Sequence, residues 1–248
     1  MRRKLISCEI FFREICRVVV ETPVVCDVEF LPKGLHDLGA DRMMPRLQAI
    51  VDQVPEGRYE AILLGYGLCN NGIVGLRARH TPLVIPRSHD CIAVFMGGSA
   101  LYRRYFDAHP GTYYRTSGWT ERNDTEGAGE ETVPQKLGLF LQYEELVEKY
   151  GEDNARYIME TMGDSVPHYS RMTYIRMGLP RDDIDAAKAR EDALEKGWVY
   201  EELQGSVDWL RRLIEGPWGD DFLVVPPGAS ICASYRDDII RLASEPTA

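Results

Sequence analysis

Residues 59–95 read YEAILLGYGLCNNGIVGLRARHTPLVIPRSHDCIAVF and contain the two segments that decide the fold. Two short apolar runs, at 61–64 and 82–85, each end in a turn followed by polar residues. A run of this length that leads through a turn into an amphipathic segment is typical of a buried parallel strand followed by a helix. We therefore expect Cys69, His89 and Cys91 to follow the carboxyl ends of neighbouring strands, where open α/β sheets bind ligands.

The rest of the chain repeats the same alternation of short apolar runs and helical spacing. Further strands are expected at 4–7, 24–30, 197–203 and 221–225, and helices at 10–20, 41–54, 92–106, 135–162, 182–196 and 206–214. Repeated strand–helix units with short links favour right-handed crossovers and a mostly parallel sheet. The sequence thus predicts a single α/β domain over 1–248, Rossmann-like or flavodoxin-like, with helices on both faces and a helical insertion at about 120–197.

Composition excludes several classes of partner. A formal net charge of −10 argues against binding to nucleic acid and to anionic membrane surfaces, both of which require basic proteins. No apolar run approaches the roughly 20 residues of a membrane span, and the basic N-terminus lacks the apolar core of a signal peptide. We therefore expect a cytoplasmic protein.

Six cysteines are too few for a disulfide scaffold in 248 residues, and a cytoplasmic setting keeps them reduced. Their positions fall into two groups. Three lie within apolar stretches and are expected to pack as small hydrophobic side chains: Cys16, Cys26 and Cys232. The other three follow predicted strands and raise the functional question: Cys8, Cys69 and Cys91.

These thiols and His89 predict a metal site. Zinc binds thiolate and imidazole ligands, and a catalytic zinc needs only three protein ligands and an open position. Candidate ligands are Cys8, Cys69, His89 and Cys91. Glu9 and Asp90 are the candidate catalytic carboxylates, with Glu9 an alternative ligand and Asp90 either a supporting partner or a helix cap. No CxxC or HExxH pattern is present, so capping and packing by the same residues is the competing interpretation.

Residues near these ligands suggest two further interpretations. The Gly-rich turn offers backbone N–H groups to an anion, although it lacks the Walker lysine–serine pair and the dinucleotide fingerprint. Three aromatic residues after it, Tyr113, Tyr114 and Trp119, can cover a planar or cationic ligand, or can simply belong to the core. The candidate cofactor-binding residues are Gly65, Gly67, Asn70, Asn71, Gly72, Tyr113 and Trp119.

A thiol in the same place can instead be a nucleophile. Cys69 or Cys91 would then be activated by His89 and by a helix N-terminus. Sequence alone does not separate a nucleophile from a metal ligand, because both require a thiolate.

Several motifs together resemble a known family. They are GYGLCNNG at 65–72, PRSHDCI at 86–92, PGTYY at 110–114, GW at 118–119, YGEDNA at 150–155, GWVYEEL at 197–203 and VVPPG at 224–228. The chain resembles the bacterial and archaeal family catalogued as domain of unknown function 1638. Such proteins are similar to ones found beside corrinoid-dependent methyltransferase systems, so the resemblance implies a link to one-carbon metabolism.

Three functions remain in competition. The first is a protein with a zinc-type or other divalent metal that acts on a small molecule, in methyl transfer if the resemblance applies. The second is a non-catalytic module that binds a corrinoid or a small anion for a methyltransferase or corrinoid-protein partner. The third is a purely structural role in which the polar residues at the strand ends act as caps.

Overall fold

The main sheet is five-stranded and mostly parallel. The structure is a computed structural model that describes residues 2–121, 151–152, 156, 169–234, 236 and 238–243. The strand order is β2-β1-β3-β4-β8, in which β1, β2, β3 and β4 are parallel and β8 is antiparallel to β4. The strands are β1 (Arg2–Cys8), β2 (Val25–Leu31), β3 (Ala61–Gly65), β4 (Leu83–Pro86) and β8 (Phe222–Val225). The α/β class and the mostly parallel sheet predicted from sequence are confirmed.

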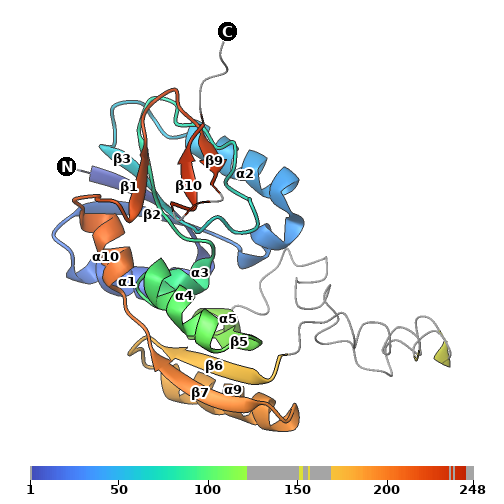
Figure 1. Ribbon diagram of the computed structural model, residues 1–248. Helices are drawn as coiled ribbons and strands as arrows, with labels where there is room; N and C mark the ends of the chain where they lie inside the picture. Colours follow the sequence, from blue (N-terminus) through green and yellow to red (C-terminus); the bar gives the residue numbers. More distant parts are fainter. Residues whose placement is uncertain are drawn as a thin grey trace.

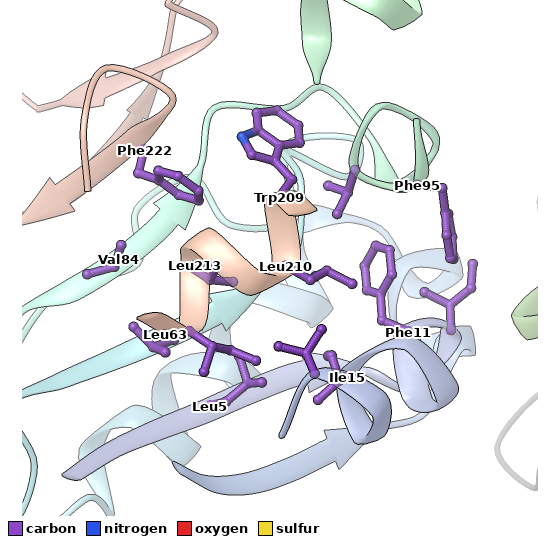
Figure 2. Packing of buried hydrophobic residues seen from close by; sticks show 14 of the residues in the cluster. Leu5, Phe11, Ile15, Leu63, Val84, Phe95, Trp209, Leu210, Leu213 and Phe222 are labelled. Carbon is purple, nitrogen blue, oxygen red and sulfur yellow. The ribbon is translucent and has the colours of Figure 1, made fainter. Parts of the chain in front are cut away.

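The central strands are apolar because both of their faces are covered. Every residue of β3 and β4 is buried, as expected for strands with helices on both sides. Successive side chains point to opposite faces, so Leu5 packs with Ile15 and Leu213 while Ile6 packs with Met43. Figure 2 shows the first of these two clusters, in which helix α10 lies over the strands.

The helices that form these two layers agree with their predicted positions. One layer contains α1 (Phe12–Glu21) and α10 (Asp208–Glu215). The other contains α2 (Ala40–Asp52) and a hairpin of β9 (Ile231–Ala233) and β10 (Ile240–Leu242). Short 3-10 helices, η1 (Glu9–Phe11) and η2 (Lys33–Leu38), follow β1 and β2. Within the described ranges, no helix combines the length and the apolar character that crossing a bilayer requires.

A second, three-stranded parallel sheet has the order β5-β6-β7. Its strands are β5 (Thr112–Arg115), β6 (Arg171–Arg176) and β7 (Val199–Gln204), and α9 (Asp182–Glu195) links the last two. The helix α9 was predicted, but β6 lies inside the expected helical insertion at 120–197. The helix expected at 135–162 lies outside the described residues, except for 151, 152 and 156.

Short helices lie between the two sheets (Figure 1). They are α3 (Cys91–Phe95), α4 (Ser99–Ala108) and α5 (Ser117–Glu121). The break predicted at 97–98 separates α3 from α4, where Gly97 has a φ of 83°. Helix α5 lies so close to η1 that a Cβ at Gly118 would be 1.8 Å from the Ile10 carbonyl oxygen. Only glycine at position 118 allows this close packing of α5 against η1, and the packing positions the next residue, Trp119.

A buried carboxyl group, Glu14, lies on α1. Its side chain is 0% exposed, and neither carboxyl oxygen has a hydrogen-bond partner among the described residues. Burial raises the pKa of Glu14 to about 8, and the charges of Asp182 and Glu121 add to this shift while Arg13 opposes it. The folded protein therefore holds a proton on Glu14 at neutral pH.

Because the folded-state pKa of Glu14 is raised, its contribution to stability should fall as pH rises from about 4.5 to about 8. Glu14→Gln removes this ionisation, and at pH 7 it should raise the free energy of unfolding by up to roughly 3 kcal/mol relative to wild type. Urea denaturation across this pH range measures the difference. Glu195→Gln, at an exposed position of α9, is the matched control. A Glu14→Gln difference that does not change with pH would contradict this assignment.

Candidate functional site

Three cysteines lie at one edge of the main sheet. Cys8 is the last residue of β1, Cys69 follows β3, and Cys91 begins α3 after β4. The strands β1, β3 and β4 are adjacent and parallel, so their carboxyl ends meet at the same edge. The chain passes from β1 to β2 on one side of β1, and then from β2 to β3 on the other side of β1. Ligands of open α/β sheets bind at the point where the strand order reverses in this way.

The two loops that carry Cys69 and Cys91 run side by side. The backbone N–H groups of Leu68 and Cys69 donate to the carbonyl oxygens of Ser88 and His89, at 2.7 and 3.0 Å. A Cβ at Gly67 would lie 2.9 Å from the backbone of Asp90. Glycine at 67 therefore allows the close pairing that sets the distance between the two thiol-bearing loops.

The backbone at Cys69 is strained. Cys69, Asn70 and Asn71 have φ values of 46°, 55° and 64°, so three consecutive non-glycine residues occupy the left-handed region. Each such residue costs on the order of 1 kcal/mol, and strain of this kind concentrates at ligand sites. The surrounding pairing holds Cys69 in a conformation that an unconstrained loop would avoid.

The three thiols act on one another electrostatically. Burial raises the pKa of Cys8 and of Cys69 to about 12, and a charge on Cys69 raises that of Cys8 further. Burial also raises the pKa of Cys91 well above its ordinary value, with added contributions from charges on Asp90, Cys69 and Cys8. All three cysteines are free and partly buried. The three cysteines follow adjacent strand ends, as predicted, and their role as ligands stays a prediction. Without a ligand these thiols are protonated at neutral pH.

A buried lysine and an indole lie beside the thiols. Lys33 is 6% exposed, and its positive charge lowers the pKa of Cys8. Its Nζ donates to the Trp119 carbonyl oxygen at 3.3 Å and lies 5.1 Å from the centre of the Trp119 ring. The Trp119 indole N–H in turn hydrogen-bonds the Cys91 thiol. Trp119, predicted as a ligand-covering aromatic, thus contacts a candidate metal ligand directly.

Two more buried polar groups face the same region. Glu9, a predicted carboxylate, accepts a hydrogen bond from the Lys33 backbone N–H at 2.9 Å. The Tyr66 hydroxyl is within electrostatic range of Cys8, Cys69 and Glu9. Sequence reasoning missed Lys33 and Tyr66. The one available signal was that each follows a predicted strand by two or three residues, at the same edge as the cysteines.

His89 and Asp90 lie at the border of an adjacent cleft. The His89 side chain is exposed and lines the cleft, although we predicted it as a ligand beside the thiols. Asp90 caps α3 by accepting from the Ala93 N–H at 3.2 Å, one of the two roles considered for it, and also accepts from the Tyr102 hydroxyl. Burial raises the pKa of Asp90, partly offset by these hydrogen bonds.

The cleft has a volume of about 1400 Å³ and lies between α4 and the ends of β4, β8 and α10. Its lining is mixed, with arginines, aspartates and exposed apolar side chains of α4. Among the lining residues are Arg87, His89, Leu101, Tyr102, Phe106 and Trp209. The cleft is large enough for a sizeable organic ligand.

The predicted anion-binding glycines have packing roles in the structure. A Cβ at Gly65 would lie 2.1 Å from Ser7 Oγ, and one at Gly72 would lie 2.2 Å from the Met43 sulfur. The exposed side chains of Asn70 and Asn71 lie between them in the strained turn. These packing contacts require glycine at positions 65 and 72 whether or not the turn binds a ligand.

The second predicted aromatic residue, Tyr113, faces away from the thiols. Its ring contacts Tyr169 and Trp198, at centroid distances of 5.7 and 6.2 Å. The next residue, Tyr114, faces the opposite side and lies 5.8 Å from Tyr102, ring centre to ring centre. Of the two β5 tyrosines predicted to cover a ligand, Tyr114 and not Tyr113 therefore contacts Tyr102, a residue that lines the cleft.

The geometry defines a mixed α/β protein whose mostly parallel sheet has three free thiols at its carboxyl edge. Across the parts of the chain that the structure describes, no three His, Cys, Asp or Glu side chains are already close enough to hold a metal ion.

A family profile described as "Protein of unknown function (DUF1638)" matches residues 30–214, more than half of the chain. The chain belongs to this family, as its motifs indicated. Cys69, His89 and Cys91 lie inside the matched range and Cys8 lies before it. No curated protein and no solved structure matches the chain.

The raised thiol pKa values predict low reactivity in the metal-free protein. At pH 8, iodoacetamide should alkylate Cys69 and Cys91 at least about tenfold more slowly than it alkylates glutathione, because only the thiolate reacts. Peptide mass spectrometry over a time course measures each rate. Rates equal to or above that of glutathione would show that these thiols are activated, contrary to the structure.

Proposed function

We propose that the protein binds a zinc-type divalent metal ion through Cys8, Cys69 and Cys91 and presents it to a small molecule. The observation that carries this proposal is the position of three cysteines at the carboxyl ends of three adjacent parallel strands, beside the point where the strand order reverses. We further propose that the sheet is a Rossmann-like or flavodoxin-like layer structure, which places ligands at this same edge.

The chemistry of the thiols supports a metal more than a free nucleophile. A thiol with a pKa of about 12 is almost entirely protonated at neutral pH, so it attacks an electrophile poorly. A bound zinc ion displaces the proton outright and binds the thiolate. Reduced thiols also fit the cytoplasmic location that we propose from the sequence.

The groups around the thiols are suited to support a metal-bound thiolate. The Trp119 N–H donates to Cys91, and the Lys33 ammonium offsets negative charge near Cys8. Hydrogen bonds and charges of this kind orient metal ligands and tune the charge on them. Three protein ligands would leave one coordination position for a substrate atom or for His89.

One-carbon transfer is the reaction class that we propose for this site, following the family resemblance. Cys8, Cys69 and Cys91 would hold the metal, and the metal would supply Lewis-acid activation of a substrate thiol as the acceptor of a methyl group. Glu9 and Asp90 are the nearby carboxyl groups proposed to accept the thiol proton.

A second candidate function is binding of a corrinoid for a methyltransferase partner. The observation that favours it is the cleft of about 1400 Å³, with Leu101 and Phe106 exposed on one wall. A cavity of this size suits a large amphipathic cofactor rather than a small metabolite. Under this alternative the thiols contribute little to binding.

Metal analysis tests the first proposal. Protein purified from zinc-supplemented cells should contain about one equivalent of metal by elemental analysis. Cys69→Ser and Cys91→Ser should each lose most of the bound metal, because each substitution removes one of the proposed thiolate ligands. Cys232→Ser, in β9, should retain the metal of wild type. Less than a tenth of an equivalent in folded wild type would rule the site out.

The same variants separate the two functions. If the protein is a corrinoid-binding module, hydroxocobalamin should co-elute with wild type in gel filtration, and Cys69→Ser should bind it equally well. Failure of wild type to retain hydroxocobalamin would remove the second candidate.

A further inference from the structure

Glu14, on α1, is a buried carboxyl group at the place where α1 meets α5. Its side chain is 0% exposed, and among the described residues no group hydrogen-bonds either carboxyl oxygen. An ionised carboxylate is strongly unfavourable in such a place, because neither water nor a donor stabilises its charge. The closed junction between α1 and α5 therefore accepts Glu14 only as the neutral acid.

The charged groups around Glu14 make its ionisation less favourable still. Burial is the largest cause of its raised pKa, and the negative charges of Asp182 on α9 and Glu121 on α5 raise this pKa further. Arg13 lowers the pKa of Glu14, but its guanidinium is already paired with Glu121 at 2.7 Å. Asp182 accepts a hydrogen bond from the Tyr174 hydroxyl of β6 at 3.0 Å. Further ion pairs at this junction join Arg181 to Glu121 and Asp185, and Arg17 to Glu21.

Helix α5 connects this junction to Cys91. The helix is only five residues long, so its stability depends on packing against its neighbours rather than on its own hydrogen bonds. Its last residue, Glu121, pairs with Arg13, the neighbour of Glu14 in sequence. Its third residue, Trp119, donates its indole N–H to the Cys91 thiol. One short helix thus contacts the surroundings of Glu14 and also covers Cys91.

We propose that the junction of α1 and α5 is a pH-sensitive gate over Cys91. When Glu14 loses its proton, α5 separates from α1, so that water reaches the new carboxylate and the Cys91 thiol becomes accessible. This inference does not depend on metal binding, because it concerns the access of any small molecule to this thiol.

The two pKa values of Glu14 set the pH dependence of the gate. The pKa is about 8 in the closed junction, and water restores the ordinary value of 4.5 in the open one. Because closure raises the pKa of an acid, the closed form is favoured at low pH and becomes less stable as the pH rises. The ratio of open to closed protein should increase about tenfold per pH unit between these two values and level off above about pH 8.

Alkylation of Cys91 tests the gate. Iodoacetamide labels the wild-type and Glu14→Gln proteins at several pH values between about 6 and 9, and peptide mass spectrometry measures each rate. The ratio of the wild-type rate to the variant rate cancels the thiolate fraction, which changes with pH in both proteins alike. This ratio should rise roughly 50-fold from pH 6 to pH 8, and only about twofold more from pH 8 to pH 9. A ratio that stays constant over this range would overturn the inference.

Two variants and one further measurement complete the test. Glu14→Met is similar in size and carries no charge, so it should give the same rise as Glu14→Gln. Glu195→Gln, at an exposed position of α9, should be labelled like wild type at every pH. Labelling through the gate should also change less than about twofold in 1 M urea, since opening a short helix exposes little surface. A labelling rate that rises with urea as steeply as global unfolding does would show that the whole chain unfolds to expose Cys91, and would overturn the inference.

Discussion

Parallel pairing of β1, β3 and β4 is the constraint on which the rest of the structure depends. Because the three strands are adjacent and run in the same direction, the residues that follow them must meet at one edge. The pairing continues past the strands, where the N–H of Cys69 donates to the carbonyl of His89. Thiols that are far apart in sequence are thereby held in one region before any ligand binds.

If the protein binds a metal as we propose, burial at this edge has opposite effects on the metal-free and the metal-bound protein. It raises the pKa values of the thiols, so the metal-free site is neutral and its cysteines behave as small apolar side chains. The same burial strengthens any interaction with a divalent cation, because water no longer screens it. The strained turn at Cys69 and the unpaired hydroxyl of Tyr66 each lower the stability of the ligand-free protein.

Local pattern sufficed for β1, for the continuous apolar runs of β3 and β4, which are buried on both faces, and for the break between α3 and α4. It also placed Cys8, Cys69 and Cys91 correctly, since strand ends in a parallel sheet share an edge. It failed for β6, where Tyr174 and Met172 alternate with polar residues within a region of helical composition. It predicted both Tyr113 and Tyr114 as ligand-covering residues, although neighbouring residues of a strand point to opposite faces, and which face each takes depends on tertiary packing. Lys33 was missed because a lone lysine in a loop normally lies in solvent.

The most direct test of the account is a crystal structure of zinc-loaded protein with anomalous diffraction collected at the zinc edge. The account predicts a single strong anomalous peak at the carboxyl edge of the main sheet. Three sulfur atoms, from Cys8, Cys69 and Cys91, should lie about 2.3 Å from that peak. A map without a peak there, or with zinc held only by surface carboxylates and imidazoles, would contradict it.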